Sequence, residues 1–313
     1  MRVLSLFDGI SCALVALKRA GISVDEYYAS EIDKYAISVS AKNHPEILRL
    51  GDVREVGLIP DIDLMIWGSP CQDLSIAKKG RKGLDGERSG LFWEAVRILE
   101  LNKPKWWVME NVASMSSQDR DTISRTLGVQ PVMINASLVS AQNRKRLFWA
   151  NFPITQPLDK GIILRDILTT NSEASSRSNK MVKIGYIGEG HQYGQGGQAH
   201  RVYADVGKSP TLGSSGCLVL GYIGNTNSQG NRVYSADGKS VCLSANGGGG
   251  GAKTGLYMLS QDVRKLVPVE CERLQGLPDD YTAGISNTQR YKCLGNAFNV
   301  DVVAHIFSGI SDI

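Results

Sequence analysis

Residues 62–71 read IDLMIWGSPC, and this stretch decides the fold. A mostly apolar run ends at Gly68, and Ser69, Pro70 and Cys71 follow it directly. A short apolar run bounded by glycine and proline is typical of a buried strand. Pro70 lacks a backbone donor and has a fixed φ, so it stiffens the exit from that strand. The stretch therefore predicts a buried strand with a cysteine just beyond its carboxyl end.

Other short apolar runs alternate with amphipathic stretches through the first half of the chain. The runs at 2–7, 27–30, 105–110 and 130–136 read as strands, with helical patterns at 11–20, 33–42, 90–101 and 118–127. This alternation predicts an α/β, doubly wound parallel sheet with helices on both faces. Ligands of such sheets bind beyond the carboxyl ends of the strands. Those ends carry Phe7-Asp8-Gly9, Glu31, Asp52, Ser69-Pro70-Cys71 and Glu110-Asn111.

Composition narrows the class of protein. The chain has 313 residues, of which 42% are hydrophobic, enough for a sizeable core. The opening MRVLSLFDGISCAL fits neither a signal peptide nor a membrane span, so we expect a cytoplasmic protein without a membrane partner. The six cysteines include no C-x-x-C pair and the chain has 4 histidines, which argues against zinc and against a disulfide framework. We therefore predict no metal.

The amino-acid composition of the chain changes after about residue 155. Nineteen of the 34 glycines lie between Gly185 and Gly255, and residues 177–262 hold eight basic against four acidic side chains. This basic, glycine-rich stretch predicts a smaller β-rich module at 161–263 that faces a polyanion. Helical texture returns at about 264, so we expect residues 1–160 and 264–313 to form one discontinuous domain.

The second module contains an internal repeat. GYIGEGHQYGQGGQAHRVYADVGKSPTL at 185–212 is echoed by GYIGNTNSQGNRVYSADGKSVCL at 221–243. Each copy combines a β-like start, a glycine-rich loop, an R-V-Y strand, a turn and a further strand. Thr211 of the first copy corresponds to Cys242 of the second.

Cys71 has two interpretations from the residues alone. A cysteine is most often an inert core residue. Here the basic, glycine-containing stretch QDLSIAKKGRKGLDGERSG follows it, as a lid over a charged substrate would. Glu110 could lie across the same pocket, and Arg144 and Arg146 alternate on one predicted strand, with surface cations as the alternative. Glu31 and Asp52 suit ribose and adenine contacts, or are solvated carboxylates.

Together these motifs resemble the DNA (cytosine-5) methyltransferase family. The matching elements are FDGIS at 7–11, GSPCQDLS at 68–75, ENV at 110–112, QNRKR at 142–146 and RYKCLGNAFNV at 290–300. They follow the family's order over nearly the whole chain. The stretch after Cys71 is similar to the eukaryotic de novo branch. The second repeat resembles the target-recognition domain of the bacterial enzyme that modifies GCGC.

The resemblance implies catalytic roles. Cys71 would add as a thiolate to carbon-6 of cytosine, which makes carbon-5 nucleophilic. Glu110 would hydrogen-bond ring nitrogen 3 and the exocyclic amine, Arg146 would bind the carbonyl oxygen, and Arg144 would support the site. Carbon-5 would then take a methyl group from S-adenosyl-L-methionine, and loss of its proton would release the enzyme.

The resemblance also implies a binding site for that methyl donor. Ser11 departs from the family's second glycine, and Ile32 replaces a frequent aromatic residue. The implied cofactor-binding residues are Phe7, Gly9, Ile10, Glu31, Ile32, Asp52, Val53, Pro70, Leu91, Asn296 and Ala297.

Double-stranded DNA is the implied partner. The target base must leave the duplex to reach Cys71, so a side chain should fill its place. Gln229, three residues before Arg232, matches the family's infiltrating glutamine, and Gln198 before Arg201 matches it in the other repeat. Arg232 or Arg201 would read guanine, or the repeats form only a scaffold. The predicted DNA-binding residues are Gln72, Ser75, Lys78, Lys79, Arg81, Gln198, Arg201, Thr211, Gln229 and Arg232.

Three other functions compete with DNA methylation. The RNA-directed branch of the same fold and a catalytically inactive DNA-binding homologue stay as alternatives, whereas a nicotinamide oxidoreductase lacks the three-glycine fingerprint. We expect a monomer in a bacterial or phage-infected cell, with a cognate restriction endonuclease acting on the same DNA site.

Overall fold

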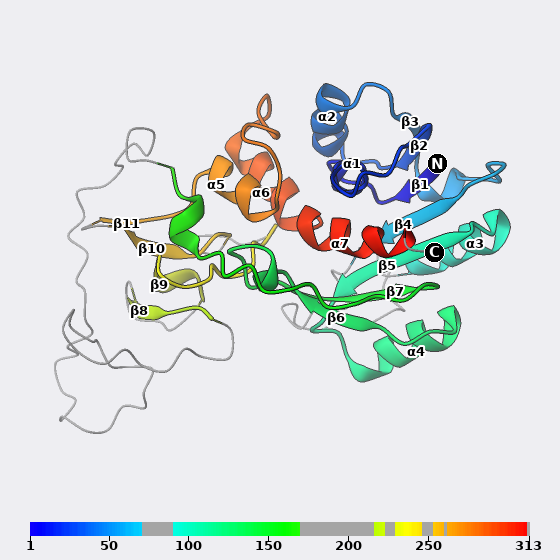
Figure 1. The fold of residues 1–313 in the computed structure, drawn as a ribbon. Helices are drawn as coiled ribbons and strands as arrows, with labels where there is room; N and C mark the ends of the chain where they lie inside the picture. The colour runs from blue at the N-terminus through cyan, green and yellow to red at the C-terminus, as the bar shows by residue number, and fades with distance from the viewer. Residues whose placement is uncertain (71–89, 170–215, 223–228, 246–252, 260–261, 312–313) are drawn as a thin grey trace.

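A seven-stranded sheet forms the larger part of the computed structural model (Figure 1). The structure describes residues 1–70, 90–169, 216–222, 229–245, 253–259 and 262–311. The strand order is β3-β2-β1-β4-β5-β7-β6. The strands are β1 (Arg2–Leu6), β2 (Glu26–Ser30), β3 (Leu48–Gly51), β4 (Leu64–Gly68), β5 (Trp106–Val112), β6 (Val132–Asn135) and β7 (Lys145–Ala150).

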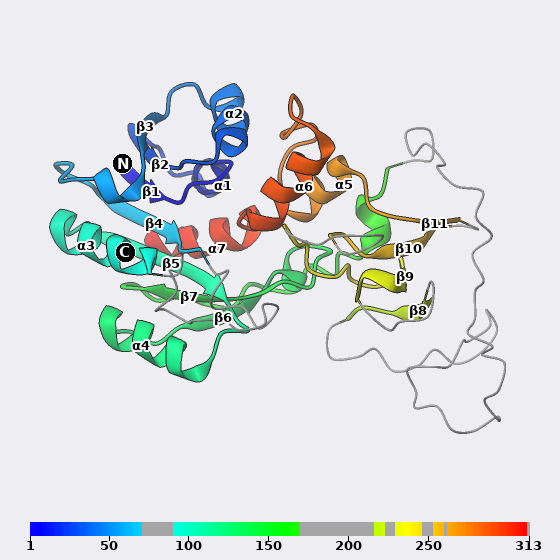
Figure 2. The ribbon, with the colours of Figure 1, turned by 180° about the vertical axis from the view of Figure 1, so that it is seen from behind.

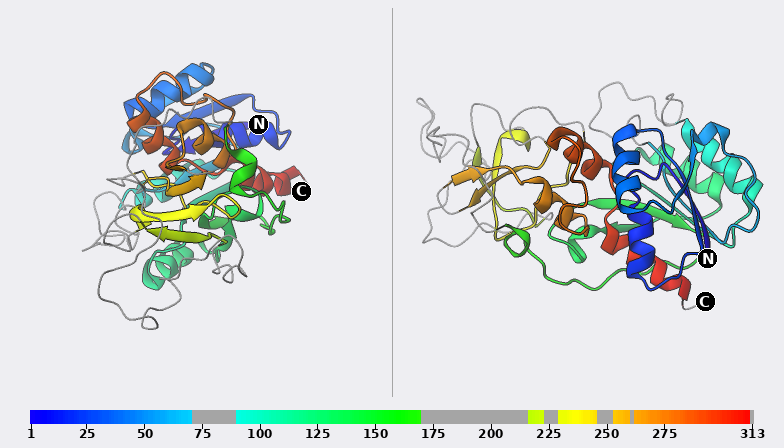
Figure 3. Two further views of the ribbon diagram at one scale, coloured as in Figure 1. Left: turned by 90° about the vertical axis from the view of Figure 1, so that its left-hand side faces the viewer. Right: turned by 90° about the horizontal axis from the view of Figure 1, so that it is seen from above.

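Helices cover both faces of this sheet, as the alternating pattern predicts. The first four are α1 (Cys12–Arg19), α2 (Lys34–Asn43), α3 (Leu91–Asn102) and α4 (Ser117–Leu127), and three more follow near the end of the chain: α5 (Pro268–Leu274), α6 (Asn287–Asn296) and α7 (Val300–Ser311). Viewed from above, α1 and α7 lie on one face and α3 and α4 on the other (Figure 3). The doubly wound α/β fold is confirmed.

Alternate residues of one strand serve two cores. Ile66 of β4 joins the cluster that includes α1 and α7, whereas its neighbours Met65 and Trp67 join the cluster under α3. Successive side chains of a strand point to opposite faces, so a strand covered on both faces must be apolar throughout. This accounts for the unbroken run LMIW.

Helix starts follow local side-chain chemistry. The Asp33 carboxylate accepts hydrogen bonds from the backbone N–H groups of Tyr35 and Ala36 at the start of α2. The Ser116 hydroxyl accepts one from Asp119 N at the start of α4. Such caps satisfy N–H groups that the helix itself leaves unpaired.

One strand runs against the predicted direction. β7 is antiparallel to both β5 and β6, where the sequence pattern predicted a parallel sheet. Short connections explain the reversal, because β6 and β7 are separated only by residues 136–144, too few for a crossover helix. The consequence is that Arg146 near the start of β7 pairs with Val112 at the end of β5.

A second, four-stranded sheet has the order β11-β10-β9-β8. Its strands are β8 (Val219–Tyr222), β9 (Arg232–Ser235), β10 (Leu256–Leu259) and β11 (Asp262–Arg264). It lies on the side toward which β4 points (Figures 1 and 2). The R-V-Y strand of the second repeat is β9, but no further strand follows its turn within the described residues 236–245; Ser240 makes only an isolated bridge to Gln142. The first repeat, at 185–212, lies outside the described residues.

The chain after β11 returns to the large sheet, where α7 packs against α1. The span Asn287–Ile310 is long enough to cross a membrane and contains an 18-residue window with a mean hydropathy of 1.2. However, 67% of that window is buried inside the fold, and the span divides into α6 and α7. Burial of this kind is typical of core helices.

Candidate active site

A glutamate and an arginine form an ion pair at the carboxyl edge of the large sheet. The Arg146 Nε lies 2.8 Å from the Glu110 Oε1, and these side chains are 16% and 13% exposed. Glu110 comes from β5 and Arg146 from β7. Gly68, the last residue of β4, is in register with Glu110, so the strand that leads to Cys71 ends beside this pair. A planar polar ligand at this edge would meet an acceptor and a guanidinium together.

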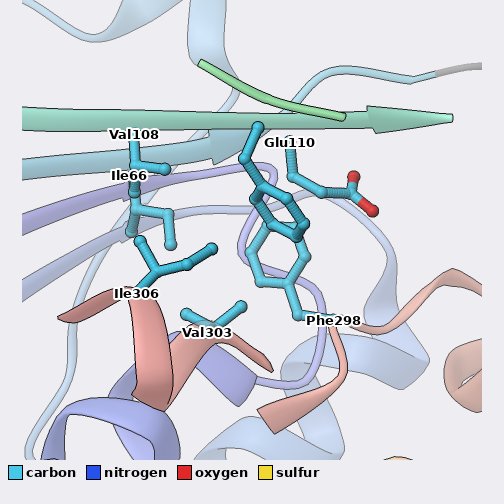
Figure 4. A pocket seen from close by; sticks show the side chains of 7 residues that line it. Ile66, Val108, Glu110, Phe298, Val303 and Ile306 are labelled. Carbon is cyan, nitrogen blue, oxygen red and sulfur yellow. The ribbon is translucent and has the colours of Figure 1, made fainter. Parts of the chain in front are cut away.

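Two aromatic rings border the same hollow. Phe148 and Phe298 line, with Glu110, Arg144 and Arg146, a small hollow at this edge. Figure 4 shows the Phe298 ring beside the Glu110 side chain. A Cβ placed on Gly68 would lie 2.8 Å from the Phe298 ring, so a side chain there would displace that ring. Phe298 was not among the predicted site residues, although it lies two residues beyond Asn296 in the matched GNAFNV element.

Arg144 differs from the expectation that it shares a strand face with Arg146. It precedes β7, its side chain is only 3% exposed, and its backbone N–H donates to Asn135 Oδ1 at 2.9 Å. Its guanidinium donates to the carbonyl of Ala297 at 2.8 Å and to that of Gly295 at 3.3 Å. Arg144 therefore ties the loop before β7 to the end of α6.

The loop after β1 meets the end of β2. The Glu31 carboxylate accepts hydrogen bonds from Gly9 N on one oxygen and from Ile32 N and Asp33 N on the other, each at 2.8 Å. Burial raises the pKa of Glu31, against the effect of these N–H groups. Gly9 has φ +61°, with no atom of the described residues within 4 Å of the place where a Cβ would lie, and Ile32 is 70% exposed. This leaves open space in front of Gly9 and an apolar surface beside it.

Ser11 stands at the position where the family has its second glycine. Its φ is +61°, a left-handed conformation that a side chain disfavours. Its hydroxyl donates to Asp8 Oδ2 at 2.5 Å and contacts the Ser40 hydroxyl at 2.6 Å. Tyr27 OH donates to the other Asp8 oxygen at 2.7 Å. A buried hydrogen-bond network therefore compensates for the absent glycine.

The other predicted cofactor residues divide by burial. Ile10, Val53 and Ala297 are buried. Asp52 caps a short 3-10 helix, Val53–Glu55, by accepting from Arg54 N at 3.0 Å. The remaining predicted positions flank the same edge: Phe7 in the loop after β1, Pro70 after β4, Leu91 at the start of α3 and the exposed Asn296 at the end of α6.

Few of the predicted DNA contacts lie in the described part of the chain. Arg232 begins β9, and Gln229 begins the 3-10 helix Gln229–Asn231 just before it. The others lie outside the described residues together with the predicted nucleophile: Cys71, Gln72, Ser75, Lys78, Lys79, Arg81, Gln198, Arg201 and Thr211. Among the residues that are described, no three His, Cys, Asp or Glu side chains group to hold a metal ion.

The sheet is doubly wound, with Glu31 after β2 and the Glu110–Arg146 pair beside the end of β4, as in Rossmann-like folds that bind a ligand at the strand ends. The family model of C-5 cytosine-specific DNA methylases matches residues 1–312. The chain therefore belongs to this family and is a DNA (cytosine-5) methyltransferase.

Individual relatives agree with this assignment. The chain is 29% identical over 344 residues to the type II methyltransferase M.HhaI of Haemophilus parahaemolyticus, covering 98% of this chain and 93% of that one. It is 26% identical over 428 residues to the orphan methyltransferase M.SPRI of Bacillus phage SPR, covering 98% and 96%.

Solved structures share the fold. The methyltransferase EhMeth of Entamoeba histolytica superposes with a TM-score of 0.69 at 16% identity, over 100% of this chain and 98% of that one. A putative DNA modification methyltransferase from an E. coli prophage gives 0.63 at 20% identity, over 100% and 99%.

Proposed function

We propose that this enzyme methylates carbon-5 of a cytosine flipped out of a specific duplex DNA sequence, through a covalent adduct with Cys71. The observation that carries the proposal is the Glu110–Arg146 pair at 2.8 Å, beside the strand end that leads to Cys71. Residues 1–160 and 264–313 would form the catalytic domain, and 161–263 the recognition domain with its repeat at 185–212 and 221–243.

Each proposed residue has a separate role at the base. The Cys71 thiolate adds to carbon-6, and the electrons move onto the ring toward nitrogen 3 and the carbonyl oxygen. Glu110 accepts a hydrogen bond from the exocyclic amine and supplies a proton to nitrogen 3 as electron density builds there, and Arg146 donates to the carbonyl oxygen where charge also develops. Arg144 supports them from behind. After the methyl group is in place, removal of the carbon-5 proton expels the Cys71 thiolate and restores the ring.

S-adenosyl-L-methionine would supply the methyl group as a sulfonium when bound. The residues at the β1 and β2 ends fit it. A carboxylate has about four lone-pair positions, so Glu31 retains acceptor capacity for ribose hydroxyls beyond its three backbone N–H groups. Exposed Ile32 offers an apolar surface to an adenine ring, and Asp52 an acceptor for its amino group.

Residues in and next to the small sheet would recognise the DNA sequence. Gln229 would fill the space of the flipped base and Arg232 would read guanine from the major groove. Gln198, Arg201 and Thr211 of the first repeat are the alternative readers. The residues that follow Cys71, namely Gln72, Ser75, Lys78, Lys79 and Arg81, would contact the DNA backbone.

The cellular setting follows from the relatives. Bacterial type II and phage orphan methyltransferases both resemble this chain, which supports a cytoplasmic enzyme of a bacterial or phage-infected cell. We propose a monomer, with a cognate restriction endonuclease that shares the DNA site without direct contact.

One experiment tests the function and the nucleophile together. The protein is incubated with a tritiated methyl donor and either duplex DNA or transfer RNA. We expect label on DNA, none with Cys71→Ala, and retained label with the control Cys217→Ala. Duplex DNA with 5-fluorocytosine at the target, whose carbon-5 carries no removable proton, should trap a covalent adduct on Cys71. Label on RNA alone, or undiminished label with Cys71→Ala, contradicts the proposal.

A further inference from the structure

A segment of the recognition region, Lys239–Ala245, lies against the catalytic part of the chain. Ser240 N donates to Ala141 O at 2.7 Å, and Ser240 O accepts from Asn143 N at 2.9 Å. The Lys239 ammonium donates to the carbonyls of Ser137, Ser140 and Ile162. At the other end of the segment, a Cβ on Gly295 would lie 2.3 Å from Ala245 N, so the two backbones are in close contact. The segment is thus fixed on both sides of Cys242.

Arg144 is the side chain that Cys242 meets. Its Nη1 lies 3.5 Å from the Cys242 sulfur. Burial lowers the pKa of Arg144, and so does the neighbouring Arg146 guanidinium. Its Nε is buried and lacks a hydrogen-bond partner among the described residues. A buried cation is costly unless an acceptor faces it, and the other Arg144 partners are neutral carbonyls.

The Cys242 sulfur suits that position. Burial opposes ionisation of the thiol, but the Arg144 and Arg146 guanidiniums outweigh burial and lower the pKa of Cys242 below its ordinary value of 9.0. In the protonated form, the thiol donates to Leu243 O at 3.5 Å. The charged groups around it are Arg144 and Arg146 before and on β7, with Glu110 of β5 paired to Arg146.

We propose that Cys242 is a positioning residue for the methyl transfer, because its sulfur holds Arg144, which supports the neighbouring Arg146 where it pairs with Glu110 beside the base pocket. The inference rests on the proposed function of Glu110 and Arg146. It gives the recognition region a direct influence on the catalytic arginines, through a residue that is a threonine in the first repeat.

The test compares Cys242→Ala and Cys242→Ser with the control Cys217→Ser in the full-length enzyme. Cys217 belongs to the same region and its sulfur lies 3.5 Å from Ser240 O, so it matches Cys242 in setting. We expect Cys242→Ala to lower kcat roughly ten-fold, the size of one hydrogen bond to a charged group, with KM for the donor unchanged. Cys217→Ser should keep the wild-type kcat.

A pH profile separates positioning from packing. As pH rises toward 9.0, the ordinary thiol value, a growing share of the wild-type thiol ionises and its attraction to the arginines increases, whereas a serine hydroxyl does not ionise. The ratio of wild-type to Cys242→Ser kcat should therefore rise with pH, and the titration of Cys71, common to both proteins, cancels.

The outcomes are distinguishable from failure of the proposed function. An active Cys71→Ala variant would contradict the assignment of Cys71 as the nucleophile but would not bear on the positioning role of Cys242. A flat ratio across the pH range, or a Cys242→Ala variant with wild-type kcat, overturns the positioning role even when Cys71→Ala is inactive.

Discussion

The two sheets of this enzyme differ in how far polar contacts add to apolar burial in holding them in place. In the large sheet, apolar side chains such as Ile66 and Trp67 are buried on both faces. The small sheet has strands of three or four residues; Tyr234 and Tyr257 are buried in the core, and polar anchors such as Lys239 and Glu270 add to that burial. The large sheet is thus held by burial, which is non-directional, and the small sheet by burial together with directional contacts. Conservative polar substitutions should therefore damage chemistry in one region and domain placement in the other.

Glu110→Gln is expected to give the largest effect on the catalytic side of this comparison. The amide keeps the shape of the side chain but removes the charge that pairs with Arg146 and that would hold the base. We expect kcat to fall by about 10²- to 10³-fold, as when a positioned charge or proton-transfer group is lost. Single-turnover methylation measures it.

The control is Glu100→Gln, at an exposed position on α3. Glu100→Gln should match wild type in turnover and in thermal unfolding, whereas Glu110→Gln, which breaks a mostly buried ion pair, should also lose some stability. Wild-type turnover by Glu110→Gln would show that Glu110 takes no part in the reaction.

Glu270→Gln is expected to give the largest effect at the joint between the two regions. The buried Glu270 carboxylate accepts from Arg264 at 2.7 and 2.8 Å, where the chain leaves the small sheet. It also accepts from Thr169 N at 3.1 Å, just after the 3-10 helix Leu164–Ile167. Breaking a buried ion pair costs about 3–5 kcal/mol. Urea unfolding should show a loss of this order, and DNA binding should weaken more than donor binding.

The pH dependence of this loss has a definite sign. Burial alone would raise the pKa of Glu270, but the Arg264 hydrogen bonds and the nearby N–H groups lower it below 4.5. A lowered pKa gives stability that is present above the unfolded-state value and is lost as pH falls through the folded-state value. The gap between wild type and Glu270→Gln should therefore be widest at neutral pH and shrink in acid.

A surface ion pair provides the control for Glu270. Glu94 pairs with Arg97 at 2.8 Å on α3, with both side chains more than a third exposed. Glu94→Gln should cost about 0.5 kcal/mol or less at any pH. Equal losses for the two variants would mean that Glu270 does not anchor the small sheet.

The sequence predicted more of the catalytic edge than of the joint. Glu31 and Glu110 were placed correctly at strand ends, because apolar runs and their boundaries are local signals. The reversed direction of β7 was missed, since a run such as RLFWA fits either direction. Arg144 and Cys242 are 98 residues apart in the sequence, so no local pattern predicts their contact. Its one trace in the sequence is the change from Thr211 to Cys242 between the repeats.

Ser11 offers the smallest and sharpest test, at the catalytic edge. The left-handed backbone of Ser11 costs about 1 kcal/mol for any residue with a Cβ. Ser11→Ala keeps that cost and loses the hydrogen bond to buried Asp8, so it should destabilise by about 1–2 kcal/mol. Ser11→Gly loses the same bond but removes the strain, so it should be about 1 kcal/mol more stable than Ser11→Ala. Thermal unfolding of the pair isolates the backbone contribution, because neither variant has the hydroxyl. Equal stability of the two would mean that the left-handed backbone at this position carries no strain and that the surrounding core holds the loop at no cost, which would extend control by burial to the cofactor loop itself.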